Sequence, residues 1–463
     1  MPTTIVIVMI IYFAVMALFG YLGKKHSDSF KNHLNIARTA GPLMVICSAV
    51  GTHVGNGFVV GGAADGAAIG LGGAVYGLGC ALSYIVVAVL IGNFLYKGNY
   101  VSLKDFLYQR YGDRVTGIVY DVSTTLSYIG NVGAQLMAGY ALFEALGING
   151  AYGVIAIAVV VFIYTQFAGL WGSFSTSVIQ TVIIFAALIA TSIVILSKGG
   201  IDAIVAANAA GKMPENAFKL ISMSFPAFIG LTIPTSISTL VDQCVVQRIN
   251  SAKSAKTAVW GHIWSGLVLV PLAFLPTFIG MYGHAVYGVS DKSAFFLVLL
   301  NDLPSILAAI AVCAVLAAVM STISGMYTSF SVTIVKDIYH DIINPKAGDK
   351  QLKVISLILS VITTVCCVLI ALYADSIINL LCATYVFIGA ACLIPFLGGI
   401  VWKKGNAKGA IASSIVGVLV CILDMVGVFK PTYESLFPLI PALVAYVVVS
   451  LLTQNKTKAV EAK

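Results

Sequence analysis

The sequence predicts an all-α protein that crosses a membrane many times, and three observations support this prediction. Of the 463 residues, 59% are hydrophobic and only 10% are charged, whereas soluble domains carry about a quarter charged residues. The mean hydropathy is +1.00, and apolar segments long enough to span a bilayer recur along the chain. Two of these segments are interrupted by helix-breaking residues. We therefore expect 13 transmembrane helices and no soluble domain of useful size.

The segment at 41–62, GPLMVICSAVGTHVGNGFVVGG, could cross a bilayer but makes a poor continuous helix. Its centre, 51–57, holds three glycines, and each costs roughly 1 kcal/mol relative to alanine in a helix. Broken backbone at membrane depth is tolerated only where it lines a polar cavity or holds a ligand. Close helix packing through small residues is the alternative. The presence of Thr52, His53 and Asn56 at the same depth favours a binding site.

The other apolar segments are considered in chain order. The segment at 4–23 has no basic residue before it and two lysines after it, which indicates a retained anchor rather than a cleaved signal peptide. The 220–246 segment contains Pro226, Pro234 and a polar run at 235–239, and is the second interrupted helix. Uninterrupted helices are expected at 74–96, 116–146, 150–168, 173–197, 257–284, 305–335, 354–373, 376–401, 409–428 and 436–453.

The basic residues support a topology with the N-terminus outside and the C-terminus in the cytoplasm. In this arrangement 21 of the 26 lysines and arginines fall in cytoplasmic connections or the tail, and five fall outside. The positive-inside rule requires this asymmetry in a multi-pass protein of the plasma (inner) membrane. The asymmetry also explains a pI of about 8.9 without a nucleic-acid partner. The segment at 97–115 is then a cytoplasmic connection and 198–219 an outer loop. The lipid bilayer surrounds the chain, and no obligate protein partner is evident.

The two interrupted helices are five helices apart. Corresponding breaks in two halves of a chain are typical of inverted-repeat transporters, whose sites lie at the breaks. The predicted organisation has an N-terminal extra helix with a cytoplasmic connection, two repeats of five helices, and two further helices with a short cytoplasmic tail. These units are expected at 1–40, 41–200, 201–405 and 406–463.

The helix at 305–335 supplies a second group of polar atoms. The adjacent hydroxyls of Ser321 and Thr322, with the Ala318 carbonyl one turn back, can offer three oxygens to a small hard cation. Such hydroxyls ordinarily bond a carbonyl of their own helix, and that interpretation would prevail without the broken 41–62 segment. Carbonyls freed at Gly51 and Val54 can complete an oxygen cage that suits Na+ without a carboxylate.

Three motifs in this chain resemble the sodium:solute symporter family. They are SAVGTHVGNGFVVGG at 48–62, DQCVVQR at 242–248 with the following Ala-Lys pair, and AAVMSTISG at 317–325 followed by VKDIY. Their order and spacing agree with the family from about 41 to 405. The resemblance implies the five-plus-five inverted repeat of neurotransmitter-type symporters and Na+ as the coupling ion. It carries the family's sodium site onto Gly51, Val54, Ala318, Ser321 and Thr322.

Two departures from the family pattern concern the number of sodium ions. Members with a second sodium site carry an aspartate in a TDxxQ run, and Ser177 occupies that position here. A hydroxyl expected after Ser324 is replaced by Gly325. The resemblance therefore implies one Na+ per transport cycle.

Other positions restrict the class of substrate that the site could bind. The sugar-binding positions of the glucose symporters are His53, Phe58 and Gly77 here, and the tryptophan positions of the choline carriers are His53 and Asp242. These residues argue against hexoses and against quaternary ammonium ligands held by cation–π contact. His53 could instead be a packing histidine bonded to a carbonyl, but its place inside the break favours substrate contact. The residues expected at the substrate site are Thr52, His53, Asn56, Phe58, Tyr76, Asn131 and Gln135.

Asp242 and Arg248 are close in sequence near the cytoplasmic end of the 220–246 helix, and we expect them to form a structural or inner-gate ion pair. The function predicted overall is Na+-coupled symport of a small polar solute, with an amino acid or a small organic acid favoured. The alternatives are a transporter-like nutrient sensor and an H+-coupled carrier. An enzyme or an ATP-driven pump is not expected, because the chain has no GxxxxGK[ST] run.

Overall fold

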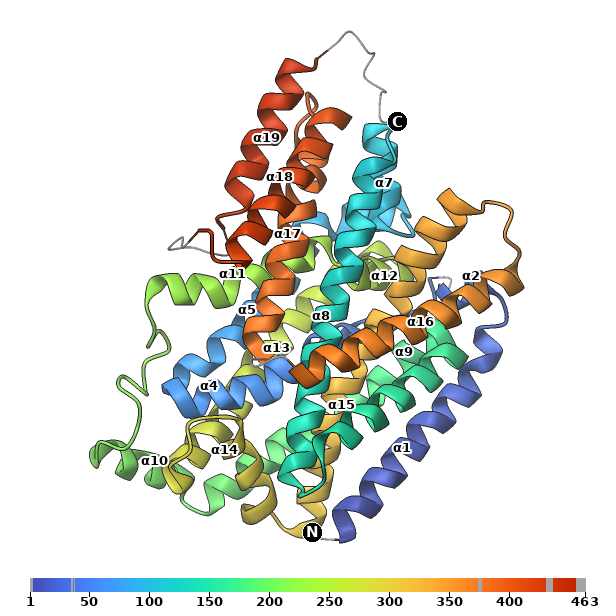
Figure 1. The fold of residues 1–463 in the computed structure, drawn as a ribbon. Coiled ribbons are helices and arrows are strands. Elements are labelled where there is room, and N and C mark those ends of the chain that lie inside the picture. The colour runs from blue at the N-terminus through green and yellow to red at the C-terminus, as the bar shows by residue number, and fades with distance from the viewer. Residues whose placement is uncertain (1–2, 35, 37, 374–376, 430–435, 455–463) are drawn as a thin grey trace.

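The computed structural model describes residues 3–34, 36, 38–373, 377–429 and 436–454, with side chains omitted for 377–379. This part of the chain is a bundle of long, tilted helices (Figure 1), and its one β-bridge joins Ala40 and Ala252. The extra N-terminal helix α1 lies at one edge of the bundle, and α18 and α19 lie at the opposite edge. The long helices carry large hydrophobic residues on their exposed faces as well as on their buried faces. This is expected for helices that contact lipid on one side and protein on the other.

The element bounds, with η marking 3₁₀ and π segments, are α1 Thr3–Gly23, η1 Lys24–His26, α2 Phe30–Leu34, α3 Pro42–His53, η2 Gly57–Gly61, α4 Gly62–Ile69, η3 Gly70–Gly73, α5 Ala74–Val87, η4 Ala88–Gly92, α6 Asn93–Gly98, α7 Leu103–Tyr111, α8 Val115–Ala145, α9 Gly150–Ser197, α10 Gly200–Ala209, α11 Phe225–Val241, α12 Gln243–Ser251, α13 Ala255–Tyr287, α14 Lys292–Leu297, η5 Val298–Asp302, α15 Ser305–Phe330, η6 Ser331–Ile343, α16 Asp349–Tyr373, α17 Ile377–Val401, α18 Ala407–Met425 and α19 Leu439–Leu452.

Eight helices of the described residues are long and apolar enough to span a membrane, or nine if the bent pair α11–α12 counts as one span. The expected number of 13 stays a prediction. Two of the eight helices are 42 and 48 residues long, whereas about 20 residues of helix cross the hydrocarbon core. The longer one, α9, joins the helices expected at 150–168 and 173–197 through a kink at Gly169. Each of these two long helices therefore has the length of two spans.

The bundle is organised around α15, which packs along α9 and also against α1 and α8. In the most apolar stretch of the α15–η6 helix, 83% of the residues are buried inside the protein. The corresponding stretches of α1 and of α16 are each only 28% buried. Three short helices were not predicted: α2, in the connection expected at 26–40, α7, in the connection expected at 97–115, and α10, in the outer loop expected at 198–219. A local signal for α7 exists, because the Asp105 carboxylate accepts hydrogen bonds from the backbone N–H groups of Val101 (3.0 Å) and Ser102 (3.1 Å) and so caps the helix start.

The first predicted break is confirmed. Helix α3 ends at His53, the backbone leaves helical geometry at Val54 (φ −79°, ψ 58°), and the helix resumes through η2. Gly55 lies in the gap, where no side chain would fit. A Cβ atom there would lie 2.6 Å from Gln135 Oε1 and 2.7 Å from Thr322 Oγ1. The missing side chain thus lets α8 and α15 approach the broken backbone closely.

The second interruption, predicted within 220–246, is confirmed, but the prolines do not cause it. Pro234 lies inside the continuous helix α11, and the chain bends by 55° between α11 and α12. The bend is at Asp242, whose backbone is extended (φ −77°, ψ 120°). Its carboxylate accepts a hydrogen bond of 2.7 Å from the Cys244 N–H and so begins α12 as an N-cap. A prolyl kink is therefore not the cause of this break.

The kink in α9 is packed against the cytoplasmic connection predicted at 26–40. Gly169 has a φ of +56°, and a Cβ atom there would lie 2.6 Å from the backbone oxygen of His33. The His33 ring is buried, and its Nδ1 lies 2.7 Å from Ser27 Oγ. Burial lowers the pKa of His33 from 6.5 to about 4, with a smaller contribution from Lys353.

This buried histidine is expected to make the fold sensitive to acid. As pH falls from 6.5 towards about 4, the unfolded chain binds a proton at His33 that the folded chain refuses, so stability falls by up to about 3 kcal/mol. Thermal unfolding midpoints in detergent should therefore fall less on acidification in His33→Gln than in the native protein. His26→Gln, which changes an exposed histidine of the same connection, is the control. Equal losses in the native protein and His33→Gln would contradict the prediction.

Candidate functional site

The break after α3 faces the middle of α15, and neutral oxygen atoms from both elements converge there. Ser321 Oγ donates to the Gly51 carbonyl at 2.6 Å and lies 3.0 Å from the Ala318 carbonyl. Thr322 Oγ1 lies 2.9 Å from the Thr52 carbonyl and 3.2 Å from that of Ala318. All five residues are buried. Hydroxyl and carbonyl oxygens at this spacing are ligands suited to a hard monovalent cation.

The arrangement brings together four of the five residues predicted for Na+. Val54 is the exception: its N–H donates to the Val50 carbonyl at 2.8 Å, and no described contact joins its carbonyl to the cluster. The Thr52 carbonyl, which the sequence analysis did not include, makes the closer contact with Thr322. The roles of these residues in holding Na+ remain a prediction.

Ser177 and Gly325, the two positions that depart from the two-sodium pattern, each have a close polar neighbour. Ser177 Oγ donates to the Ser173 carbonyl of its own helix at 2.6 Å. At Gly325 a Cβ atom would lie 2.8 Å from the Arg248 guanidinium. The guanidinium therefore occupies space that a side chain at 325 would need, and its positive charge disfavours a second cation nearby.

The expected ion pair between Asp242 and Arg248 is absent, although both side chains are described. Arg248 is fully buried and donates to the carbonyls of Ser48 (3.2 Å) and Cys244 (2.8 Å) and to Thr52 Oγ1. Asp242 accepts from the Tyr128 hydroxyl and from the Cys244 N–H. The two side chains therefore have different partners on either side of the 55° bend. Asp242 caps the start of α12 at the break, and Arg248 connects α12 to α3.

A polar cavity lies beside the break, enclosed by α3, α8, α11, α15 and α17. Its volume is about 20 Å³, which is room for little more than one water molecule. The surrounding helices must therefore separate further to admit a solute. The lining residues are Thr52, His53, Ser127, Tyr128, Asn131, Ser238, Asp242, Met326, Tyr385 and Ile388.

Of the seven residues predicted for the substrate, Thr52, His53 and Asn131 line this cavity, and the other four are not among its lining residues. Asn56 donates its backbone N–H to Gln135 Oε1 at 2.6 Å and its side chain to the Ala134 carbonyl at 2.5 Å. These bonds attach the broken backbone to α8, and a role of Asn56 and Gln135 in substrate binding stays a prediction.

The remaining two residues, Phe58 and Tyr76, pack near glycines. A Cβ atom at Gly77 would lie 3.1 Å from the Phe58 ring, and one at Gly57 would lie 3.2 Å from the Tyr76 hydroxyl. The lining residues not predicted for the substrate site include Ser127, Tyr128, Ser238, Met326, Tyr385 and Ile388. The polar run at 235–239 was a signal for Ser238, and the i, i+4 spacing with Asn131 on α8 was a signal for Ser127.

His53 is held in a defined orientation at the edge of the cavity. Its Nδ1 lies 2.7 Å from the Tyr84 hydroxyl, and its Nε2 lies 3.3 Å from Thr239 Oγ1. The Tyr84 hydroxyl also lies 2.7 Å from the Ala49 carbonyl, and Thr239 Oγ1 donates to the Thr235 carbonyl at 2.5 Å. Each ring nitrogen of His53 therefore has a hydroxyl neighbour, and these two neighbours fix the orientation of the imidazole.

We expect His53→Ala to weaken substrate binding by about tenfold, because a hydrogen-bonding group on the cavity wall would be lost. Substrate concentration dependence of uptake, measured with native protein and His53→Ala at several pH values, checks this. Tyr84→Phe is the control for orientation, since it keeps the imidazole but removes its 2.7 Å partner. Unchanged substrate affinity in His53→Ala at every pH would make the histidine a packing residue.

A helix broken at membrane depth, neutral oxygens gathered at the break and an enclosed polar cavity beside it define a secondary transporter. The chain belongs to the sodium:solute symporter family, whose sequence model matches residues 36–417.

Curated relatives of similar length support the assignment to this family. The chain is 27% identical over 478 residues to the high-affinity proline transporter PutP of Bacillus subtilis (strain 168), with 96% of this chain and 97% of that protein covered. It is 26% identical over 444 residues to the sodium/pantothenate symporter of Escherichia coli (strain K12), with 91% and 89% covered.

Solved structures show the fold. A Na+-coupled sialic acid symporter in a substrate-bound outward-open state matches with a TM-score of 0.84 at 18% identity, covering 97% of this chain and 98% of that one. Mhp1, a nucleobase-cation-symport-1 family transporter, matches in a closed conformation with a TM-score of 0.63 at 12% identity, covering 91% and 95%. At these identities the likeness concerns the fold alone.

Proposed function

We propose that this protein carries a small polar solute across the plasma membrane together with Na+, by alternating access at the cavity beside the α3 break. Na+ is the coupling ion of this symporter family. The observation that supports the site is the pair of adjacent hydroxyls, Ser321 and Thr322, directed at the Gly51 and Thr52 carbonyls. A cation there would bridge the broken helix and α15, so its binding would couple to their relative position.

The substrate we propose carries an amino group, which favours an amino acid over a simple organic acid. Asp242 lines the cavity, and no lysine or arginine belongs to that lining. A buried carboxylate beside a solute requires a positive partner or a proton. Arg248 is not part of the lining but donates to Thr52, which is, and adds positive potential near the cavity. The proline transporters among the curated relatives are consistent with a zwitterionic substrate.

We also propose that the repeats predicted at 41–200 and 201–405 are related by inversion. Each begins with the broken helix of its half, α3–α4 in the first and α11–α12 in the second, as inverted-repeat transporters do. The distribution of lysines and arginines supports an N-terminus outside and a tail in the cytoplasm. Protease or thiol-reagent accessibility from each side of the membrane would test this orientation.

We expect one Na+ and one net positive charge to move with each zwitterionic solute. The Arg248 guanidinium beside Gly325 would repel a second cation. Counterflow of labelled amino acids in proteoliposomes, with and without Na+, identifies the substrate. Reversal potentials under imposed Na+ and substrate gradients then give the coupling ratio. A ratio of two would contradict the one-ion site, and Na+-independent uptake driven by a proton gradient would contradict the Na+ site itself.

A further inference from the structure

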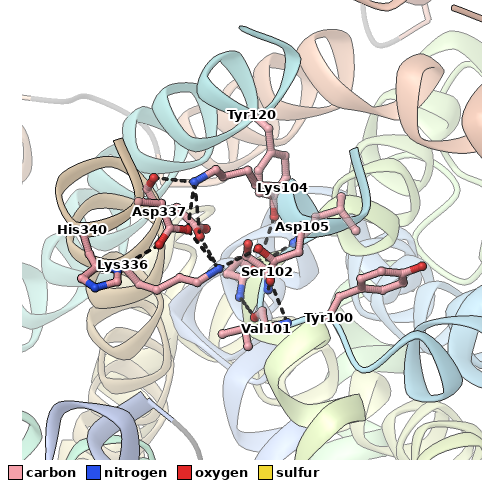
Figure 2. A network of polar contacts seen from close by, with 12 residues as sticks. Tyr100, Val101, Ser102, Lys104, Asp105, Tyr120, Lys336, Asp337 and His340 are labelled. Atoms are coloured by element: carbon pink, nitrogen blue, oxygen red, sulfur yellow. Dashed lines mark hydrogen bonds and ion pairs between the residues drawn. The ribbon is translucent and has the colours of Figure 1, made fainter. Parts of the chain in front are cut away.

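A charged network outside the cavity joins α7 and η6, at the ends of the helices predicted to face the cytoplasm (Figure 2). Lys336 Nζ lies 2.7 Å from Asp105, 2.8 Å from Asp337 and 3.5 Å from Asp341. Lys104 Nζ lies 3.2 Å from Asp341 and also donates to the Asp337 backbone carbonyl. Two ammonium groups thus hold three carboxylates.

A fourth carboxyl group in this region has no ammonium partner. Asp121, on α8, is 0% exposed, and neither of its carboxyl oxygens accepts a hydrogen bond within the described residues. It faces the carboxyl group of Asp337, which is also 0% exposed and whose Oδ1 lies 2.8 Å from Lys336 Nζ. The other ionisable groups directed at Asp121 are Lys104 of α7, Lys336 of η6, Tyr120 of α8 and Cys392 of α17.

Neither of two simpler explanations accounts for this arrangement. Burial of an unpartnered carboxylate costs several kcal/mol, and two carboxylates in contact repel each other further. A divalent cation could in principle be held by Asp105, Asp337 and Asp341, whose oxygens lie within 4.8 Å of one another. Lys336 Nζ, however, lies within 3.5 Å of all three, so an ammonium group already fills the place of the cation.

We propose that Asp121 is a proton-binding site, at which a buried carboxylic acid donates its O–H to the Asp337 carboxylate. One proton, taken from water on the face predicted to be cytoplasmic, converts two facing acceptors into a donor and an acceptor. Asp337 remains ionised and keeps its 2.8 Å contact with Lys336. The network then holds three carboxylates and two ammonium groups, and no buried carboxylate lacks a partner.

This proton is held only while α7 and α8 remain packed on η6, since each element supplies part of the site. If this face opens during transport, which rests on the proposed alternating access, water reaches Asp121 and the charged form is no longer penalised. Opening therefore releases the proton, and closing takes one up. By linkage, acid on this face stabilises the closed arrangement and slows opening.

Infrared difference spectra test the proton directly and need no substrate. We expect purified native protein at neutral pH to show one more protonated-carboxyl C=O band than Asp121→Asn, whose amide N–H replaces the acid O–H. If that variant does not fold, Asp337→Asn removes the same band, because its amide donates to an ionised Asp121. Asp202→Asn, on the exposed first turn of α10, should leave the band in place. Superimposable carboxyl regions for the native protein and either network variant would overturn the proposal.

Transport gives a second test that separates this proposal from the Na+ site. Uptake by native protein should fall when the pH on the α7 face is lowered from about 8 to about 6, and in Asp121→Asn the ratio of these rates should be about one. Uptake in both proteins should still require Na+. An Asp121→Asn protein that keeps the native pH ratio would overturn the proposal, as would Mn2+ binding that Asp105→Asn abolishes. Loss of Na+ dependence would instead count against the proposed function.

Discussion

Replacing both Ser321 and Thr322 with alanine is expected to raise the Na+ concentration for half-maximal uptake by tenfold or more. The two hydroxyls approach the Gly51 and Thr52 carbonyls at 2.6 and 2.9 Å, and with them form the cluster of neutral oxygens. A hydrogen-bonding group that contacts an ion contributes about 1.5–3 kcal/mol, and 1.4 kcal/mol corresponds to about tenfold in affinity. The measurement is initial uptake in proteoliposomes as a function of external Na+.

A matched control comes from the same helix. Thr328 is buried on α15 and donates to the Gly325 carbonyl at 2.7 Å, so Thr328→Ala removes a hydroxyl of the same kind outside the oxygen cluster. It should leave the Na+ dependence unchanged. If the Ser321/Thr322 double variant folds, reaches the membrane and keeps native Na+ dependence, the sodium site lies elsewhere.

Substitution of Asp242 by asparagine is expected to weaken binding of an amine-bearing substrate by about tenfold to a hundredfold. The substitution keeps the size of the side chain, and its amide oxygen can still accept from the Cys244 N–H at the start of α12. The fold should therefore survive while the negative charge on the cavity wall is lost. Substrate concentration dependence of uptake at saturating Na+ measures the change.

Two comparisons make this result specific. Asp302→Asn removes a carboxylate that pairs with Lys198 at 3.2 Å, away from the cavity, and should not alter substrate affinity. An analogue of the substrate without its amino group should bind native protein and Asp242→Asn equally weakly. Unchanged affinity for the amine-bearing substrate in Asp242→Asn would assign Asp242 to the helix cap alone and would favour an anionic solute.

Local properties of the sequence determined much of the fold. Composition alone indicates membrane helices, because 59% apolar residues with 10% charged ones cannot form a soluble surface. The interruption after His53 follows from glycines that disfavour helix within a few residues of one another. The Ser321–Thr322 pair could be predicted because two adjacent hydroxyls and the carbonyls of a broken helix together supply oxygens for a small cation. The family assignment followed from the order and spacing of three motifs.

The arrangement of the second break and of the sites was decided by tertiary structure. Pro234 is a local helix breaker, yet the bend occurs at Asp242, where Tyr128 from α8 and the Cys244 N–H hold the carboxylate. Ser321 meets Gly51 across 270 residues of chain, and Arg248 lies against Gly325. Helices that are apolar all round carry little periodicity to show which face turns inward. Asp121 and Asp337 likewise become neighbours only when α8 packs on η6, so the chain alone could not show that they face each other.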